Sequence, residues 1–124
     1  VKLVKVSENE VVLKLANKKR VRNHIGGIHA IAAAVLAESA TGIVFGMNVP
    51  DKCLPLLKSM TINYQRRMQG DLQAVAKLSA EQIKFIKAEE KGDLTVAVTI
   101  TDESGQMPIE CIMEWAWVSK KRKA

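Results

Sequence analysis

A short segment from Asn23 to Ala30 combines an amide, two glycines and a histidine just before a strongly apolar stretch. Gly26 and Gly27 let the backbone come close to a ligand. If a helix begins here, the N–H groups of its first turn have no intrahelical acceptor and can stabilise a developing oxyanion. The segment therefore predicts a site that binds and polarises a carbonyl group.

The acid that could act on such a carbonyl is Glu38, which follows Leu36 and Ala37 in the apolar stretch. A carboxylate buried without partners is costly and becomes easier to protonate. That property suits a general base that activates water. A structural alternative stays open, in which Glu38 is paired or faces a polar surface near the end of a helix.

The spacing between His29 and Glu38 constrains how both could serve one reaction. Nine positions along a helix place two side chains on opposite sides, about 13.5 Å apart along the axis. They cannot meet in one site of one subunit. If both take part, we expect them to come from different copies of the chain.

The element that must position these residues is a helix from about Ile28 to Phe45. It is apolar on every side, so we expect it to be buried on nearly every side. Gly42 and Gly46 predict its end.

The rest of the chain shows strand patterns, in which apolar and polar residues alternate. The pattern predicts an α+β fold, a curved antiparallel sheet of about six strands around one long buried helix. The open edges of such a sheet favour pairing with a second copy. The segment Ile83–Lys87 is ambiguous. The predicted strands are Val1–Val6, Glu10–Ala16, Met60–Gln65, Leu72–Ser79, Leu94–Thr101 and Ile109–Trp117.

The order of these residues resembles the hot-dog fold thioesterases of the phenylacetyl-CoA type. Their fingerprint is Asn, a Gly-containing loop, His, a small residue, and then Leu-Ala-Asp or Leu-Ala-Glu on the central helix. The segment from Tyr64 to Leu72 is similar to the strand-turn-strand that follows the helix in that family. The matching residues here are Asn23, Gly26, His29, Ala30, Leu36, Ala37 and Glu38.

The resemblance implies hydrolysis of an acyl-CoA or acyl-carrier thioester by a homodimer or a dimer of dimers. Glu38 would be general base or nucleophile across the dimer interface, and Asn23 would position water or the thioester. The Ala30 backbone amide, beside the Gly27 loop, would polarise the carbonyl, and His29 would orient it. CoA would enter as part of the substrate, with no other cofactor. The candidate substrate-binding residues are Ser59, Thr61, Arg66 and Arg67, the arginines as CoA-phosphate ligands or as a solvated edge.

Two departures from the family pattern keep a second hypothesis open. Ala30 stands where the family usually has Gly, and Glu38 where Asp is commoner. The alternative is a non-catalytic acyl-CoA-binding or acyl-ligand-binding domain on the same fold. A hot-dog dehydratase fits the loop context less well. A nucleic-acid binder rests on charge alone, because basic residues are not interleaved with aromatic ones.

Length and composition bound these interpretations. The chain has 124 residues, 48% hydrophobic and 26% charged, with a net charge of +6. These values predict a single cytoplasmic domain over residues 1–119 and a basic tail over residues 120–124. No signal peptide or membrane span is evident. Cys53 and Cys111 lack zinc-binding spacing, so we expect no metal.

Overall fold

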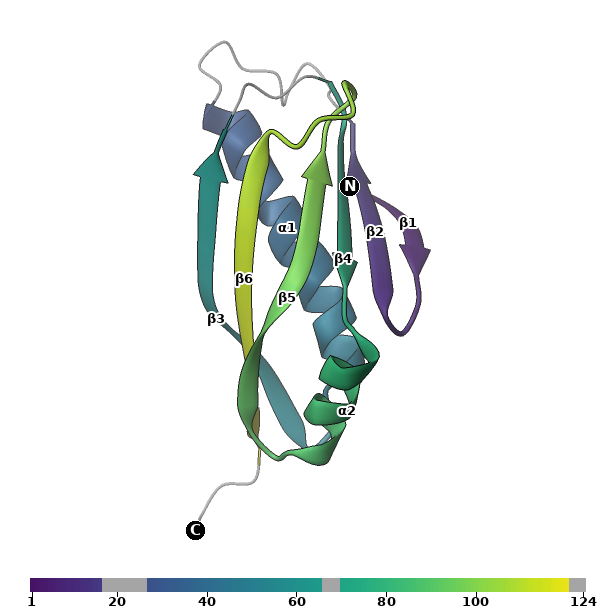
Figure 1. The fold of residues 1–124 in the computed structure, drawn as a ribbon, viewed down its shortest axis with the longest axis vertical. Coiled ribbons are helices and arrows are strands. Elements are labelled where there is room, and N and C mark those ends of the chain that lie inside the picture. The colour runs from purple at the N-terminus through teal and green to yellow at the C-terminus, as the bar shows by residue number, and fades with distance from the viewer. Residues whose placement is uncertain (17–26, 66–69, 121–124) are drawn as a thin grey trace.

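The structure is a computed structural model and describes residues 1–16, 27–65 and 70–120. It contains one six-stranded antiparallel sheet, one long helix and one short helix (Figure 1). This is the predicted α+β architecture. The elements in chain order are β1 (Lys2–Val6), β2 (Glu10–Leu15), α1 (Gly27–Asn48), β3 (Cys53–Tyr64), β4 (Leu72–Lys77), α2 (Ala80–Ala88), β5 (Gly92–Thr101) and β6 (Ile109–Ser119).

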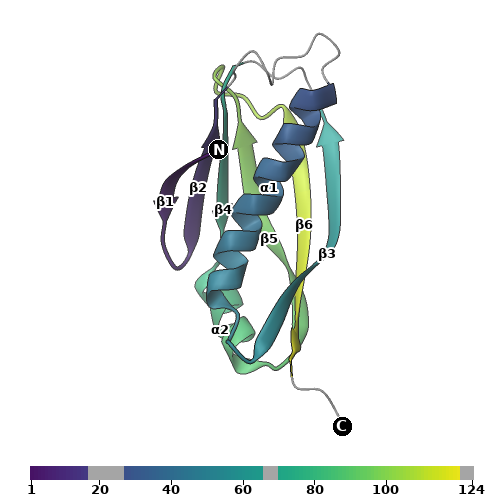
Figure 2. The same cartoon turned by 180° about the vertical axis from the view of Figure 1, so that it is seen from behind.

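The strands are ordered β1-β2-β4-β5-β6-β3, so β1 and β3 form the two edges. Figure 2 shows α1 running diagonally across one face of this sheet. We call the face covered by α1 the inner face and the opposite one the outer face. The helix packs mainly on β2, β4 and β5, less on β6 and little on β3. The inner face of the edge strand β3 is therefore only partly covered.

The core lies between α1 and the inner face. From the helix, Ala33, Leu36, Ala37, Ala40 and Val44 are fully buried. Small alanines let the helix axis approach the sheet closely. The strands contribute alternate residues, as the period of two requires; these include Val11, Leu13, Leu72, Ala74, Ala76, Val96, Ile100, Met113 and Trp117.

The predicted end of the helix is wrong. α1 continues through Gly42 and Gly46 to Asn48. The Asn48 amide stabilises this end, because it donates to the carbonyls of Val44 (2.9 Å) and Glu8 (2.7 Å). Gly42 lies inside the helix, where the absence of a side chain leaves room for the Trp115 ring.

The strand β3 extends well beyond its predicted bounds, and one segment of ambiguous pattern is a helix. β3 begins at Cys53 rather than Met60, and it includes Pro55 and an irregularity between Leu57 and Ser59. Proline is tolerated there because β3 is an edge strand. The segment Ile83–Lys87, whose sequence pattern was ambiguous, lies within the helix α2.

The start of α2 is fixed by a capping box. Ser79 Oγ accepts from the Gln82 N–H, and Gln82 Oε1 accepts from the Ser79 N–H, both at 3.0 Å. This pattern of a serine followed three residues later by a glutamine is readable in the sequence.

The segment Ile31–Asn48 of α1 is long and apolar enough to cross a membrane by composition alone, with a mean hydropathy of 1.4. The core helix of a soluble protein meets the same criterion. Here one side of the segment packs on the sheet and forms much of the core.

Candidate functional site

Glu38 lies midway along α1 on the side that faces away from the sheet, and its side chain is exposed. Within the described part of the chain, its carboxylate has no hydrogen-bond or ion-pair partner. The prediction that Glu38 is buried is therefore wrong for the single chain. The physical reason is that the sheet covers one side of α1 and no second layer of the described residues covers the other.

The same open side exposes large apolar residues. Ile31 is 65% exposed and Val35 is 49% exposed. An apolar helix predicted to be buried almost all round is thus half uncovered. Exposed apolar area of this kind marks a surface that binds a partner or a ligand. We call the side that carries Ile31, Val35 and Glu38 the open side of α1.

The first turn of α1 contains three of the predicted site residues, Gly27, His29 and Ala30. The N–H groups at the very start of a helix lack intrahelical acceptors, and the oxyanion hypothesis relies on such groups. The helix is continuous from Gly27 past Glu38, so His29 and Glu38 do lie on opposite sides, about 13.5 Å apart along the axis. One subunit does not bring them together.

Three predicted site residues, Asn23, Arg66 and Arg67, lie outside the described residues. Ser59 and Thr61 are described, and both lie on the outer face of the sheet. They alternate with Met60, which is opposite the buried Met113 on β6. Ser59 Oγ donates to the Glu114 carboxylate at 2.7 Å. The sheet therefore separates Ser59 and Thr61 from Glu38 of the same chain.

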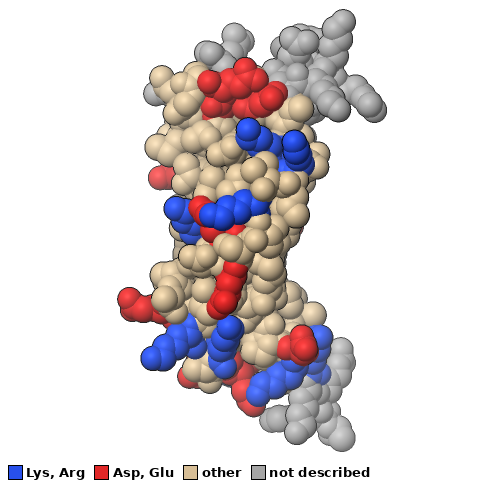
Figure 3. Space-filling view, turned by 90° about the vertical axis from the view of Figure 1, so that its right-hand side faces the viewer, with Lys and Arg blue, Asp and Glu red and all other residues tan. Residues whose placement is uncertain are grey.

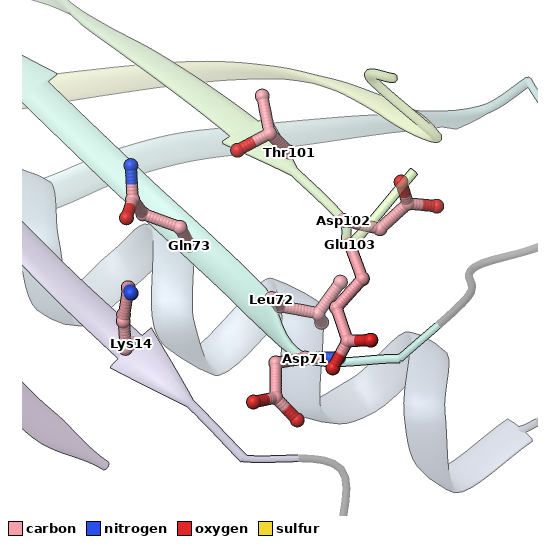
Figure 4. Close-up of a pocket in the computed structure, with 7 residues that line it drawn as sticks. All are labelled: Lys14, Asp71, Leu72, Gln73, Thr101, Asp102 and Glu103. Atoms are coloured by element: carbon pink, nitrogen blue, oxygen red, sulfur yellow. The ribbon is translucent and has the colours of Figure 1, made fainter. Parts of the chain in front are cut away.

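A cavity of about 200 Å³ lies at the end of the sheet where β2, β4 and β5 meet (Figure 4). Two acidic side chains that line the cavity accept hydrogen bonds from nearby backbone N–H groups. Glu103 accepts from the Asp71 N–H at 3.0 Å, and Asp102 accepts from the Ser104 N–H at 2.9 Å. Glu38 is not among the residues that line it: Lys14, Asp71, Leu72, Gln73, Thr101, Asp102 and Glu103.

Charged side chains of both signs are mixed on the face seen in Figure 3. Several pair within the hairpin of β1 and β2 and its neighbours. Lys5 lies 2.6 Å from Glu10, Lys77 lies 3.6 Å from Glu10, and Lys87 lies 3.4 Å from Glu8. The hydrogen bond from Lys5 is the main cause that lowers the pKa of Glu10. Among the described residues, no group of three or more His, Cys, Asp or Glu could hold a metal ion.

A polar contact close to Glu38 was not predicted from the sequence. The Trp115 indole N–H of β6 donates to the buried Thr41 hydroxyl of α1 at 2.9 Å. A lone threonine inside an apolar helix was the available signal, because a buried hydroxyl needs a partner.

Comparison with known families gives one match. The model of a family described as a domain of unknown function, DUF4442, matches residues 1–118. No curated protein matches the chain.

Solved structures share the fold. A Pseudomonas aeruginosa protein of unknown function, a probable thioesterase, is 27% identical; the match covers 95% of this chain and 82% of that one, with a TM-score of 0.85. A variant of a Staphylococcus aureus thioesterase is 18% identical, covering 94% and 92%, with a TM-score of 0.76. A Bacillus halodurans protein solved with CoA is 20% identical, covering 88% and 66%, with a TM-score of 0.67. The predicted hot-dog fold is confirmed.

Proposed function

The chain belongs to the DUF4442 family, a domain of unknown function, and we propose that it hydrolyses acyl-CoA-type thioesters with the Glu38 carboxylate as general base or nucleophile. The observation that carries this proposal is the state of Glu38 itself. It is an exposed carboxylate without a partner among the described residues, set among exposed apolar side chains. The fold that holds it is shared with a probable thioesterase at 27% identity.

We propose that the working unit is at least a homodimer. In a single chain the open side of α1 exposes Ile31 and Val35 to water, and β3 offers an unpaired edge twelve residues long. A second copy that covered both would remove Glu38 from bulk water. It would also bring the first turn of its own α1 to Glu38. This second turn is needed because His29 and Glu38 of one chain lie too far apart to meet in one site.

In the proposed reaction, Glu38 acts as general base. It takes a proton from a water molecule whose oxygen attacks the thioester carbonyl carbon. The N–H of Ala30 in the partner copy stabilises the oxyanion, with Gly27 allowing the close approach and His29 and Asn23 orienting the carbonyl and the water. The tetrahedral intermediate expels the thiolate of CoA, which receives the proton from Glu38. The alternative role of Glu38 is nucleophile, with a mixed anhydride that water then cleaves.

The substrate class follows from the same surface. An acyl chain suits the apolar open side of α1, and CoA is the ligand present in the Bacillus halodurans structure. Arg66 and Arg67, which follow β3 in sequence, are the proposed contacts to the CoA phosphates. Ser59 and Thr61 lie on the outer face, so we propose no contact between them and an acyl group at Glu38.

The test is a panel of acyl-CoA substrates of increasing chain length, with release of free thiol monitored. We expect turnover by the wild type and a loss of about a hundredfold or more in Glu38→Ala, the size of effect that a general base supplies. Size-exclusion chromatography should show the same oligomer for both. Glu81→Gln, at another exposed glutamate, is the matched control and should retain wild-type turnover.

Two outcomes would contradict the proposal. Unchanged turnover in Glu38→Ala would remove Glu38 from the reaction. Tight binding of acyl-CoA by the wild type, with no thiol released at any chain length, would favour the non-catalytic acyl-binding domain.

A further inference from the structure

We infer that Thr41 and Trp115 are positioning residues, which hold the turn of α1 that carries Glu38 at a fixed angle over β6. This inference rests on the proposed function, because it assigns a purpose to the orientation of the Glu38 carboxylate. It concerns residues that no part of the catalytic proposal uses.

The Thr41 hydroxyl makes contacts in two directions. It donates to the carbonyl of Ala37 at 2.8 Å and lies 3.3 Å from the carbonyl of Glu38. It accepts the indole N–H of Trp115 at 2.9 Å. Thr41 is fully buried, so water does not replace either contact. The result is a continuous polar link from β6 to the backbone of Glu38.

Packing around the link leaves the tryptophan ring little freedom. A Cβ added at Gly42 would lie 3.2 Å from two carbons of the Trp115 ring, tighter than ordinary contact. On the next turn, the Phe45 ring packs on Trp115 with centroids 5.7 Å apart. One indole therefore lies against three positions of α1, at Thr41, Gly42 and Phe45.

The position of these residues along the helix connects them to Glu38. Glu38, Gly42 and Phe45 are spaced i, i+4 and i+7, so they lie on one stripe of α1. Glu38 on this stripe is exposed, whereas Phe45 is fully buried. Trp115 lies where the stripe passes from open to covered. Its ring thus contacts the helix within two turns of Glu38.

The link matters because this flank of α1 has fewer contacts with the sheet than the flank over β2 and β4. The helix packs mainly on β2, β4 and β5, and its contacts with β3 are few. A helix held along one flank can roll about its axis, which would move an exposed side chain further than a buried one. A displacement of about 1 Å in a reacting group is enough to lower turnover strongly.

The experiment compares three variants by thiol release from the best acyl-CoA of the panel. Thr41→Val keeps the shape but removes the hydroxyl, and Trp115→Phe keeps an aromatic ring but removes the N–H. In both we expect kcat to fall about tenfold, with KM within about twofold of the wild type. Thr41→Ser restores the hydroxyl and should restore most of kcat.

Two controls separate positioning from loss of stability. Ile86→Ala empties a buried site on α2, remote from Glu38, and should lower the unfolding midpoint without lowering kcat of the folded protein. Thr99→Val makes the same chemical change on an exposed residue of β5 and should behave as the wild type.

The results distinguish failure of this inference from failure of the proposed function. If the wild type turns over acyl-CoA and depends on Glu38, yet Thr41→Val keeps wild-type kcat or Thr41→Ser is no better than Thr41→Val, the positioning role is wrong. If the wild type releases no thiol, or Glu38→Ala is fully active, the proposed function fails and the positioning role fails with it.

Discussion

The two sides of α1 have nearly the same composition and opposite surroundings. The sheet-facing side carries Leu36, Ala37 and Val44, all fully buried. The open side carries Ile31 and Val35, which are 65% and 49% exposed. Both sides are apolar, so the helix has no polar stripe that would mark the surface. The difference comes from the sheet, which can cover only one side of a helix that crosses it.

This difference separates two uses of apolar residues in one element. On the sheet-facing side they stabilise the chain by burial. On the open side the apolar residues do not stabilise the single chain by burial, because only another molecule could cover them. A lone carboxylate on the stabilising side would be costly, whereas on the open side Glu38 is placed without cost to the fold. Substitutions on the two sides should therefore affect different properties.

The largest expected effect is on the sheet-facing side. Leu36→Ala should reduce the free energy of unfolding by about 3 kcal/mol, because it removes buried methyl groups and leaves a cavity between α1 and the sheet. Chemical denaturation monitored by circular dichroism measures this loss. The folded fraction should retain wild-type kcat. A loss below about 1 kcal/mol would mean that this side of the helix is less tightly packed than the structure shows.

The architecture was predictable because apolar periodicity reports on the sheet and helix directly. The run from Ala30 to Ala37 predicts a buried helix, and alternation predicts the strands. The first half of β3 was missed because Pro55 and the irregularity beside Leu57 interrupt its alternation. The bounds of α1 were misjudged because Gly42 and Gly46 usually mark a helix end, whereas Gly42 here makes room for Trp115.

The candidate site was less predictable than the fold. Glu38 stands out by residue type, yet an all-apolar helix gives no indication of which side the sheet will leave open. Ser59 and Thr61 were proposed from a family resemblance, although their alternation with Met60 already places them on the opposite face of the strand. The link between Thr41 and Trp115 joins residues 74 positions apart. No local pattern contains such a contact.

An intermediate effect is expected on the open side. Val35→Lys should leave the stability of the single chain nearly unchanged, since Val35 is half exposed and lysine is a good helix former. It should weaken self-association by about thirtyfold, because a buried interface would have to desolvate the added ammonium group. Analytical ultracentrifugation measures the association, and thiol release from acyl-CoA should fall with it.

A matched substitution tests whether the open side is the interface. Val118→Lys makes the same change at an exposed valine on the outer face of β6. We expect it to associate and turn over as the wild type does. If Val118→Lys dissociates the oligomer and Val35→Lys does not, the copies meet through the outer face, and the open side of α1 has another purpose.

The smallest expected effect concerns Cys111, which lies on the inner face of β6 near the margin of the surface that α1 covers. Burial, with a smaller contribution from the Glu110 carboxylate, raises the pKa of the Cys111 thiol to about 11. The folded chain therefore favours the neutral thiol. Its contribution to stability is present below the pKa of the unfolded thiol and is lost as the pH rises towards about 11.

Iodoacetamide labelling followed by mass spectrometry measures this thiol directly, because only the thiolate reacts. At pH 8 we expect Cys111 to react at least about tenfold more slowly in the folded chain than in the unfolded chain, with the folded rate still rising above pH 9. The unfolded chain in denaturant is the reference, and Cys111→Ser identifies the labelled site. Equal labelling rates in the folded and unfolded chains at pH 8 would show that solvent reaches Cys111 freely. In that case α1 would not cover this part of β6.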